Sequence, residues 1–373
     1  MVDSDAMKAI KKIKISTYIV LGLLLMYFAL TCLIVFKNTI SGNIRVSTLK
    51  EFEDTWKAYF FRNGMWSHGD SIWTYYLTGQ LQSEEVILGS NGWLFFKAIN
   101  DSDTIADFEG TNSYSTEDYA KCKAGLEKLE KYCNQNGTRY AVIFAPNKEN
   151  VYPEFMPRKY RHASISRTDK LASEMQKAGF NVVNPKETMI ESKDVLMQDY
   201  YSYDTHWNQI GAYKGVRMCL DCMDIPTVPL ENLEADKFDL KNFGYHTGAM
   251  DDLAQMVGMR ELNFDNDNEF IIKDFPSIAW EYYETESDFG KVVSFSNDKA
   301  RTNARLLLVG DSFRSAMIPS LLFYFSDVYV IHQGAFDSQD IEEIEPDYLI
   351  IEYVERYSER VFDLDDILAQ TVD

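Results

Sequence analysis

Apolar residues recur every three or four positions along residues 115–137, the spacing that lines them up on one face of a helix. Ser115 opens this segment with acidic residues close behind it, and Gly137 closes it, as helix caps do. A continuous apolar run then extends from Arg139 to Pro146, short enough for a buried parallel strand that the proline stops. The pattern therefore predicts a helix followed directly by a buried strand.

The same alternation of patterns returns towards the C-terminus. It predicts helices at 168–179, 209–223 and about 313–325, and strands at 181–185, 304–310, 327–332 and 346–354. Repeated units of this kind predict an α/β fold, a parallel sheet flanked by helices on both faces. Between about 231 and 303 the period is lost, which predicts an irregular insertion packed beside the sheet.

The N-terminal pattern differs, because residues 15–36 are apolar without a single charge and are long enough to cross a hydrocarbon layer of about 30 Å. Lysines precede this segment, and by the positive-inside rule they place the N-terminus in the cytoplasm. No small-residue cleavage site follows, so the pattern predicts one uncleaved transmembrane helix. We therefore expect a single-pass protein of the cell membrane whose folded domain is extracytoplasmic.

Together these patterns divide the chain into predicted parts: a cytoplasmic tail at 1–14, a signal anchor at 15–36, a juxtamembrane segment at 37–84 and a folded domain at 85–373, which contains the insertion at about 231–303. The 46% of hydrophobic residues can build a substantial core. The formal net charge of −21 repels nucleic acid and anionic lipid, so no nucleic-acid partner is expected and a dense polyanion is a disfavoured ligand.

Four cysteines follow the apolar N-terminal segment: Cys122, Cys133, Cys219 and Cys222. Their even number is compatible with two disulfides in an oxidising compartment, and the pairing stays open. Cys122 and Cys133 fall in one predicted helix, about 16 Å apart, too far for a direct bridge. No second pair accompanies the C-x-x-C of Cys219 and Cys222, so zinc is disfavoured and no metal is predicted.

Ser312 lies two residues beyond the predicted strand 304–310, at the start of the next helix. In an open parallel sheet, ligands bind at the carboxyl ends of strands, so its hydroxyl can face a crevice as a nucleophile. The backbone N–H of Ser312 is then the first candidate donor to an oxyanion. The alternative is that Asp311 or Ser312 only caps the helix.

A base for such a serine is available where Asp204 and His206 stand two apart, just before a helix that Asn208 can cap. In an extended loop these two side chains point the same way, so Asp204 can accept from Nδ1 and leave Nε2 for a serine. His246 is a second candidate among the five histidines. A structural loop histidine or an Asp-x-His metal ligand are the alternatives, and the lack of an H-E-x-x-H cluster disfavours the metal.

Three further candidates follow strands at the same predicted edge of the sheet: Asn147 and Lys148 after strand 139–146, and Arg356 after strand 346–354. Each can supply an electrophile or bind sugar hydroxyls, or else form a surface ion pair. Trp207, next to His206, offers a flat surface for a sugar ring or packs in the core.

Five segments occur in an order that resembles the AlgX/AlgJ-type SGNH hydrolase-like family, including its DHHW-motif members: GSNGWLFF, APNKENVYP, DTHWNQIGAY, LLLVGDSF and PDYLIIEYVER. The resemblance covers roughly residues 85–360. It implies an SGNH-hydrolase-like fold with a permuted motif order, in which the Asp-x-His element precedes the serine. Two departures are a threonine where DHHW members have a second histidine, and the lack of a carbohydrate-binding module after the domain.

The resemblance implies a polysaccharide O-acetyltransferase without a cofactor, in which Ser312 is the nucleophile, His206 the general base and acid, and Asp204 the residue that orients the imidazole. The implied partners are a secreted or cell-wall polysaccharide as acceptor and a membrane-bound O-acyltransferase as acetyl donor, near which the predicted anchor would hold the domain. A carbohydrate acetylesterase with the same triad is the first alternative. A non-catalytic glycan-binding or assembly protein is the second, and the intact triad argues against it.

Overall fold

The computed structural model describes residues 83–98, 102–193, 195–239, 252–257, 268–277 and 292–368, and the single positions 22, 25, 26, 29 and 81. The chain separates into two compact units, Met1–Gln82 and Ser83–Asp373. The sheet, its covering helices and the candidate site all belong to the second unit.

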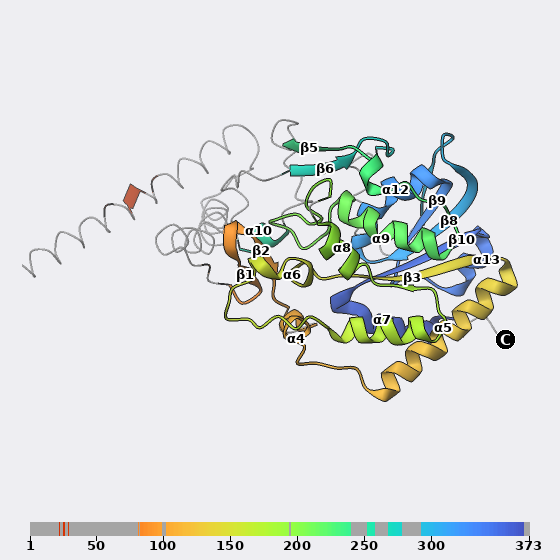
Figure 1. The fold of residues 1–373 in the computed structure, drawn as a ribbon, viewed down its shortest axis with the longest axis horizontal. Helices are drawn as coiled ribbons and strands as arrows, with labels where there is room; N and C mark the ends of the chain where they lie inside the picture. The colour runs from red at the N-terminus through yellow and green to blue at the C-terminus, as the bar shows by residue number, and fades with distance from the viewer. Residues whose placement is uncertain are drawn as a thin grey trace, which may run out of the picture. The chain divides into compact units, whose positions relative to one another are not determined.

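A six-stranded sheet forms the centre of this unit (Figure 1). Its spatial order is β4 (Val182–Val183), β3 (Arg139–Ala145), β10 (Tyr348–Val354), β8 (Thr302–Gly310), β9 (Phe325–His332) and β7 (Val293–Ser296). The first five strands run parallel, and only the edge strand β7 is antiparallel to its neighbour β9. The carboxyl ends of β3, β10 and β8 therefore meet at one edge, where open parallel sheets bind their ligands.

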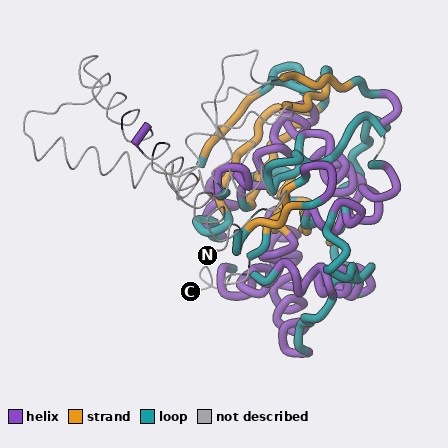
Figure 2. Tube along the Cα trace, turned by 90° about the vertical axis from the view of Figure 1, so that its left-hand side faces the viewer, coloured by secondary structure: helices purple, strands orange, loops and turns teal. Residues whose placement is uncertain are grey.

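Both faces of the sheet are buried, because alternate residues of the central strands enter two separate apolar clusters. In β3, the odd-numbered residues 141–145 join the cluster that includes α9 (Gln209–Cys222) and α12 (Ile318–Tyr324). The even-numbered residues 140–144 join the cluster that includes α5 (Thr116–Asn136), α7 (Arg167–Lys177) and α13 (Ser338–Ile344). Figure 1 labels these helices beside the strands, and Figure 2 shows helices packed against the strands from another direction, so the predicted parallel α/β sheet is confirmed.

Capping residues set the ends of α5 as the sequence predicts. Ser115 accepts a hydrogen bond from the N–H of Asp118, whose carboxylate accepts the Ser115 N–H at 2.7 Å, so the helix begins with a capping box. Gly137 ends the helix with a φ of 69°, a left-handed conformation that glycine adopts without strain.

The helix predicted at about 313–325 consists of two pieces. A six-residue 3₁₀ helix, η8 (Ser312–Met317), comes first, and α12 follows it. Pro319, near the start of α12, has no N–H to donate, so the helical bonding of η8 cannot run through it without a break. Phe325 already belongs to β9.

The remaining elements are short. They are β1 (Val86–Leu88), η2 (Ser90–Gly92), β2 (Leu94–Phe96), α4 (Thr104–Glu109), α6 (Lys148–Val151), η3 (Pro153–Phe155), α8 (Lys186–Ser192), η4 (Leu230–Asn232), η9 (Glu355–Asp363) and α14 (Leu364–Ile367). β1 and β2 form an antiparallel hairpin.

The region predicted to be an irregular insertion contains regular pieces where the structure describes it. β5 (Ala235–Asp239) pairs antiparallel with β6 (Asn268–Ile272), and α10 (Asp252–Met256) lies between them in the chain. The second histidine candidate, His246, lies outside the described residues.

The prediction of a single-pass membrane protein is wrong for the part of the chain that the structure describes, since no helix there is both long enough and apolar enough to span a bilayer. Such a span requires about 20 consecutive apolar residues in one helix. Of the predicted anchor at 15–36, only Gly22, Leu25, Met26 and Ala29 are described, and the other positions lie outside the described residues.

Cys122, Cys133, Cys219 and Cys222 are all free thiols, so the two disulfides that their number allowed are not formed. Burial raises the pKa of both Cys122 and Cys133 to about 12, which leaves almost no reactive thiolate at neutral pH.

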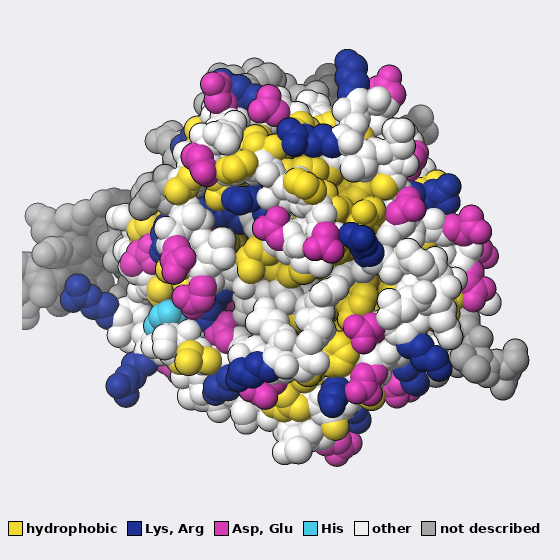
Figure 3. Space-filling view, turned by 45° about the vertical axis from the view of Figure 1, so that its right-hand side comes forward, with side chains coloured by type: hydrophobic (Ala, Val, Ile, Leu, Met, Phe, Trp, Pro, Cys, Tyr) yellow, Lys and Arg dark blue, Asp and Glu magenta, His cyan; other side chains and the backbone are white. Residues whose placement is uncertain are grey.

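On the face drawn in Figure 3, acidic and basic side chains are interspersed with apolar ones, so the net negative charge forms no single acidic area there.

Candidate active site

Residues 199–208 form a closed loop immediately before α9. A backbone bridge pairs Tyr200 with Trp207, and the N–H of Asn208 donates to the carbonyl of Asp199 at 2.8 Å. Asn208 then caps α9 as predicted, because its Oδ1 accepts the N–H groups of residues 210 and 211 at 2.9 and 3.2 Å. The loop closure brings positions 204 and 206 to the same side.

The base of this loop is anchored on α9. The Asp199 carboxylate pairs with the ammonium of Lys214 at 2.6 Å, and both side chains are fully buried. Gly211 lies directly beneath, where a Cβ would come within 2.4 Å of the Asp199 carbonyl oxygen. A glycine is therefore required at this position for the loop to approach the helix.

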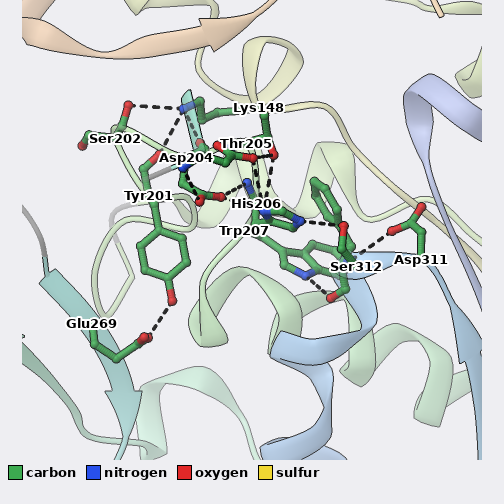
Figure 4. Close-up of polar contacts among 12 residues, drawn as sticks. Lys148, Tyr201, Ser202, Asp204, Thr205, His206, Trp207, Glu269, Asp311 and Ser312 are labelled. Atoms are coloured by element: carbon green, nitrogen blue, oxygen red, sulfur yellow. Dashed lines mark hydrogen bonds and ion pairs between the residues drawn. The ribbon is translucent and has the colours of Figure 1, made fainter. Parts of the chain in front are cut away.

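Asp204 and His206 form a hydrogen-bonded pair on the loop (Figure 4). One carboxylate oxygen of Asp204 accepts both the ring Nδ1–H of His206 at 2.6 Å and its backbone N–H at 2.8 Å. The Asp204 side chain is 1% exposed and the His206 side chain 25%. One oxygen thus holds both the ring and the backbone of His206, while the far edge of the ring remains accessible.

Ser312 follows β8 and is the first residue of η8. The cap of that helix is Asp311, whose carboxylate accepts the N–H groups of Phe313 and Val354, each at 2.9 Å. The Ser312 hydroxyl is thereby left outside the cap, and its Oγ lies 2.7 Å from Nε2 of His206 (Figure 4). The capping role therefore belongs to Asp311, and the Ser312 hydroxyl contacts His206 instead.

Charges around the imidazole favour its protonated form. Burial disfavours the charged ring, but the Asp204 carboxylate outweighs burial through its charge and hydrogen bond and raises the pKa of His206 to about 9. Asp252 adds to this increase, and the guanidinium of Arg356 opposes it. Burial also acts against the Asp204 carboxylate, yet His206 holds the pKa of Asp204 below its ordinary value. His206 therefore becomes a free base only as the pH approaches 9.

Asp252, the first residue of α10, is a site residue that the sequence did not reveal. Its carboxylate accepts the backbone N–H of Thr205 at 2.8 Å and the Thr205 hydroxyl at 2.5 Å. Its own N–H donates to the second carboxylate oxygen of Asp204 at 3.1 Å. Asp252 comes from the insertion that showed no period, and no local pattern connects it with residues almost fifty positions earlier.

A second acid from the insertion reaches the loop on another side (Figure 4). Glu269 of β6 accepts the phenol of Tyr201 at 2.6 Å, and burial raises the pKa of Glu269 to about 7. β6 is also tied to α9, because the N–H of Ile272 donates to the side chain of Gln209 at 2.5 Å. The loop is thus held by two separate pieces of the insertion.

Lys148 has a different position from the one predicted. It is 2% exposed, and its ammonium donates to the carbonyls of Tyr201, Ser202 and Asp204 at 3.1, 3.3 and 2.6 Å. All three of its protons are therefore used inside the protein, and none is free for a sugar hydroxyl or an electrophilic role. Burial lowers the pKa of Lys148 to about 8, against the pull of Asp252 and Asp204.

The hairpin β1–β2 covers this lysine. The Lys148 ammonium lies 5.6 Å from the ring centre of Trp93 and 5.2 Å from that of Phe95. In addition, the N–H of Leu94 donates to the carbonyl of Ser202 at 2.9 Å. The segments GSNGWLFF and APNKENVYP, far apart in the chain from DTHW, thus both serve to hold the loop.

Trp207 packs in the core and does not offer a surface to sugars. Its side chain is fully buried, and its ring N–H donates to the carbonyl of Phe313 at 2.8 Å. Because Trp207 follows His206 and Phe313 follows Ser312, this bond joins the segment of His206 directly to that of Ser312.

Arg356 and Asn147 differ in their relation to the triad. The Arg356 guanidinium lies 5.2 Å from the ring centre of Phe313 and close enough to His206 for its charge to lower the pKa of that ring. Asn147 is 1% exposed and donates its backbone N–H to Glu355 at 2.8 Å. No hydrogen bond between Asn147 and the triad is present in the described part of the chain. Arg356, itself 8% exposed, is therefore the one of the two whose charge acts on His206.

Asp204, His206 and Asp252 bring potential ligand atoms within 4.8 Å of one another, a spacing at which a cation can bind. The oxygen atoms of the two carboxylates already accept hydrogen bonds, from His206 and Asp252 on one and from Thr205 on the other. The donor set therefore fits a closed hydrogen-bond network, and we assign no metal to it.

Comparisons with known proteins agree with this architecture. A family model described as an SGNH hydrolase-like domain of the acetyltransferase AlgX matches residues 86–273. PatB1 from Bacillus cereus, in a structure with a sulfonyl adduct, superposes with a TM-score of 0.51 at 13% identity and covers 76% of this chain and 98% of its own. The PatB1 match shows a shared fold.

Two further solved structures are similar over the same share of the chain. A DHHW family protein from Eubacterium siraeum has 14% identity and a TM-score of 0.49, and covers 76% of this chain and 99% of its own. The O-acetyltransferase domain of Pseudomonas putida AlgJ has 16% identity and a TM-score of 0.45, with coverage of 76% and 99%. No curated protein matches the sequence.

Proposed function

Because the chain belongs to the family of SGNH hydrolase-like acetyltransferases of the AlgX type, we propose that it transfers acetyl groups to the hydroxyls of a polysaccharide through an ester on Ser312. The observation that carries this proposal is the chain of two short contacts, 2.7 Å from Ser312 Oγ to His206 Nε2 and 2.6 Å from His206 Nδ1 to Asp204. Ser312 and His206 both remain partly exposed at the carboxyl edge of the sheet.

In the first half-reaction, neutral His206 accepts the proton of Ser312 through Nε2 while Oγ attacks the acetyl carbonyl of the donor. Asp204 holds the Nδ1–H and stabilises the imidazolium that forms. The tetrahedral intermediate collapses when the bond to the leaving group breaks, and His206 returns its proton to that group. Acetylated Ser312 is the product of this step.

In the second half-reaction, a sugar hydroxyl gives its proton to His206 and its oxygen attacks the acetyl carbonyl on Ser312. The bond to Oγ breaks, the proton passes back to Ser312, and an acetylated sugar leaves. The N–H of Ser312, at the first position of η8, has no acceptor within the helix and is the nearest backbone donor for the oxyanion. We propose Arg356 as a second source of positive charge.

We propose a membrane-bound O-acyltransferase as the acetyl donor, on the basis of the family resemblance. An acetylesterase would use the same triad, with water in place of the sugar hydroxyl. Both reactions form acetylated Ser312, and they differ in the final product, which is an acetylated sugar for the transferase and acetate for the esterase. An experiment that detects both products separates them.

The full-length protein is incubated with p-nitrophenyl acetate, with and without neutral oligosaccharides, and both the sugars and the intact protein are examined by mass spectrometry. We expect an acetyl group on the protein and, when acceptor is present, acetylated sugar. Ser312→Ala should abolish both signals, and Ser296→Ala, at an exposed position on β7, is the matched control. Free acetate alone would mean an esterase, and an unchanged product pattern with Ser312→Ala would contradict the triad.

A further inference from the structure

Asp252 holds the catalytic loop from the side opposite Ser312. Both its carboxylate oxygens bind Thr205, through the backbone N–H at 2.8 Å and the hydroxyl at 2.5 Å, and its own N–H binds Asp204 at 3.1 Å. Two residues later in α10, the N–H of Ala254 donates to the carbonyl of Tyr203 at 3.2 Å. The start of α10 therefore contacts three consecutive residues of the loop.

The same carboxylate also faces the imidazole. An oxygen of Asp252 lies 3.7 Å from Nδ1 of His206, beyond the oxygen of Asp204 at 2.6 Å. The Thr205 hydroxyl lies 3.3 Å from the same nitrogen. This hydroxyl gives its proton to Asp252, so its oxygen can only accept from the Nδ1–H. Two carboxylates and one hydroxyl oxygen thus surround the edge of the ring that does not face the serine.

We propose that Asp252 is a positioning residue of the acetyl-transfer site, which together with Asp204 sets the pH at which His206 becomes a base and fixes the ring through Thr205. This inference rests on the proposed function, since it concerns the same triad. It extends the triad to a network of five side chains, with Thr205 and Asp252 added, and assigns a role to a segment that carries no recognisable motif.

Four charged groups face the imidazole or Asp252. Asp204 and Asp252 favour the imidazolium, Arg356 of η9 opposes it, and the ammonium of Lys148 acts on both carboxylates. Burial first, and the nearby charge of Asp204 second, raise the pKa of Asp252 to about 6. Asp252 is thus mostly ionised at neutral pH. Because an opposite charge within about 4–6 Å shifts a pKa by about 1–3 units, the Asp252 carboxylate contributes to the raised pKa of His206.

The first test uses Asp252→Asn, which keeps the size of the side chain and removes its charge. The pH dependence of kcat/KM with p-nitrophenyl acetate is measured for the full chain. We expect the acidic limb of the profile to move to lower pH by about one unit. Thr205→Val is the matched control, because it removes the hydroxyl and leaves the Asp252 charge in place, and it should lower kcat while the limb stays near its original pH.

The second test measures the pKa of His206 directly and does not depend on catalysis. The imidazole of His206 is titrated by NMR in Ser312→Ala, with Asp252 either present or replaced by Asn. A lower His206 pKa in the Asp252→Asn background would support the inference even if no acetyl transfer were found, so its outcome is separate from that of the proposed function. The inference would be overturned if Asp252→Asn left the pKa of His206 unchanged, or if it lowered the activity without moving the acidic limb of the kcat/KM profile.

Discussion

The two halves of the site are built in different ways. The serine half, residues 310–317, is a strand end and a short helix whose cap, Asp311, is the residue next to Ser312. The histidine half, residues 199–208, is a loop without regular structure that is held by a buried lysine and by two pieces of the insertion. The serine half is therefore a product of local structure, and the histidine half depends on chain segments that lie far away in sequence.

This difference predicts which substitutions affect only catalysis and which also affect stability. A change in the serine half should remove chemistry and leave the fold in place, because the cap and strand pairing do not involve the hydroxyl. A change in the supports of the histidine half should alter stability and catalysis together, because the same hydrogen bonds fix both the backbone and the imidazole.

The largest effect is expected for Ser312→Ala. Removal of the nucleophile should lower kcat by about 10³-fold or more. The free energy of unfolding should change by less than about 0.5 kcal/mol, because Asp311 continues to cap η8. Steady-state kinetics and urea unfolding measure the two quantities, and a loss of stability equal to that of a cap mutant would show that Ser312 shares the capping role.

Lys148→Met tests the main support of the histidine half. Three carbonyls lose the ammonium, although that of Ser202 keeps the N–H of Leu94. The free energy of unfolding should therefore fall by about 2–3 kcal/mol, and kcat/KM should fall by about 100-fold because the Asp204 backbone is released. The exposed Lys159 provides the control, since Lys159→Met should change neither quantity. Full activity in Lys148→Met would mean that the remaining contacts are sufficient to hold the loop.

The pH dependence of the wild-type protein sharpens the same contrast. Because the pKa of His206 is raised to about 9, the imidazole is protonated at neutral pH and cannot accept the serine proton. The rate of Ser312 acetylation should therefore rise with pH, by close to tenfold per unit below about pH 8, and level off near pH 9. Burst kinetics over this range measure it, and a plateau reached below pH 7 would contradict the assignment of charge.

Trp207→Phe tests the bond that joins the two halves. The substitution removes the donor to the Phe313 carbonyl and part of a buried ring, which should cost about 2 kcal/mol of stability. We expect kcat to fall by about tenfold with a smaller change in KM, since the distance between His206 and Ser312 is no longer fixed. A change confined to KM would instead indicate that Trp207 contacts the substrate.

The smallest effect is expected for Tyr201→Phe, which breaks the contact with Glu269. The loop keeps its bonds to Lys148 and Asp252, so stability should fall by about 1 kcal/mol and kcat by only a few-fold. A double-mutant cycle with Glu269→Gln isolates the pair, and a coupling near zero would remove β6 from the list of supports.

The sequence predicted the sheet well, for a local reason. Alternation of helical and continuous apolar patterns identifies the strands of a parallel sheet, and the edge at which their side chains emerge follows from the chain direction. The pair Asp204 and His206 was also visible, because residues two apart in an extended loop point the same way. Asp311 and Ser312 were separable only in the structure, since either residue type caps a helix.

Lys148 and Trp207 show what the chain alone did not decide. The sequence suggested a surface role for Lys148 and left Trp207 open between a sugar contact and a place in the core. Both side chains turn inwards, one to three carbonyls and the other to the Phe313 carbonyl. A side chain with a polar end and a long apolar body can satisfy its hydrogen bonds on either side of the surface. Only the packing around it decides which.

By itself, the sequence determined the parallel sheet, the order of its elements and the pairing of Asp204 with His206, because these follow from periodicity and from short spacings along the chain. The tertiary structure decided that Asp311 caps the helix while the Ser312 hydroxyl stays outside the cap. It also decided that Lys148 faces inwards and that Asp252 lies on the Nδ1 side of His206. Asp252 and His206 are separated by more than forty residues of chain, and no local pattern records a contact that arises only when α10 packs against the loop.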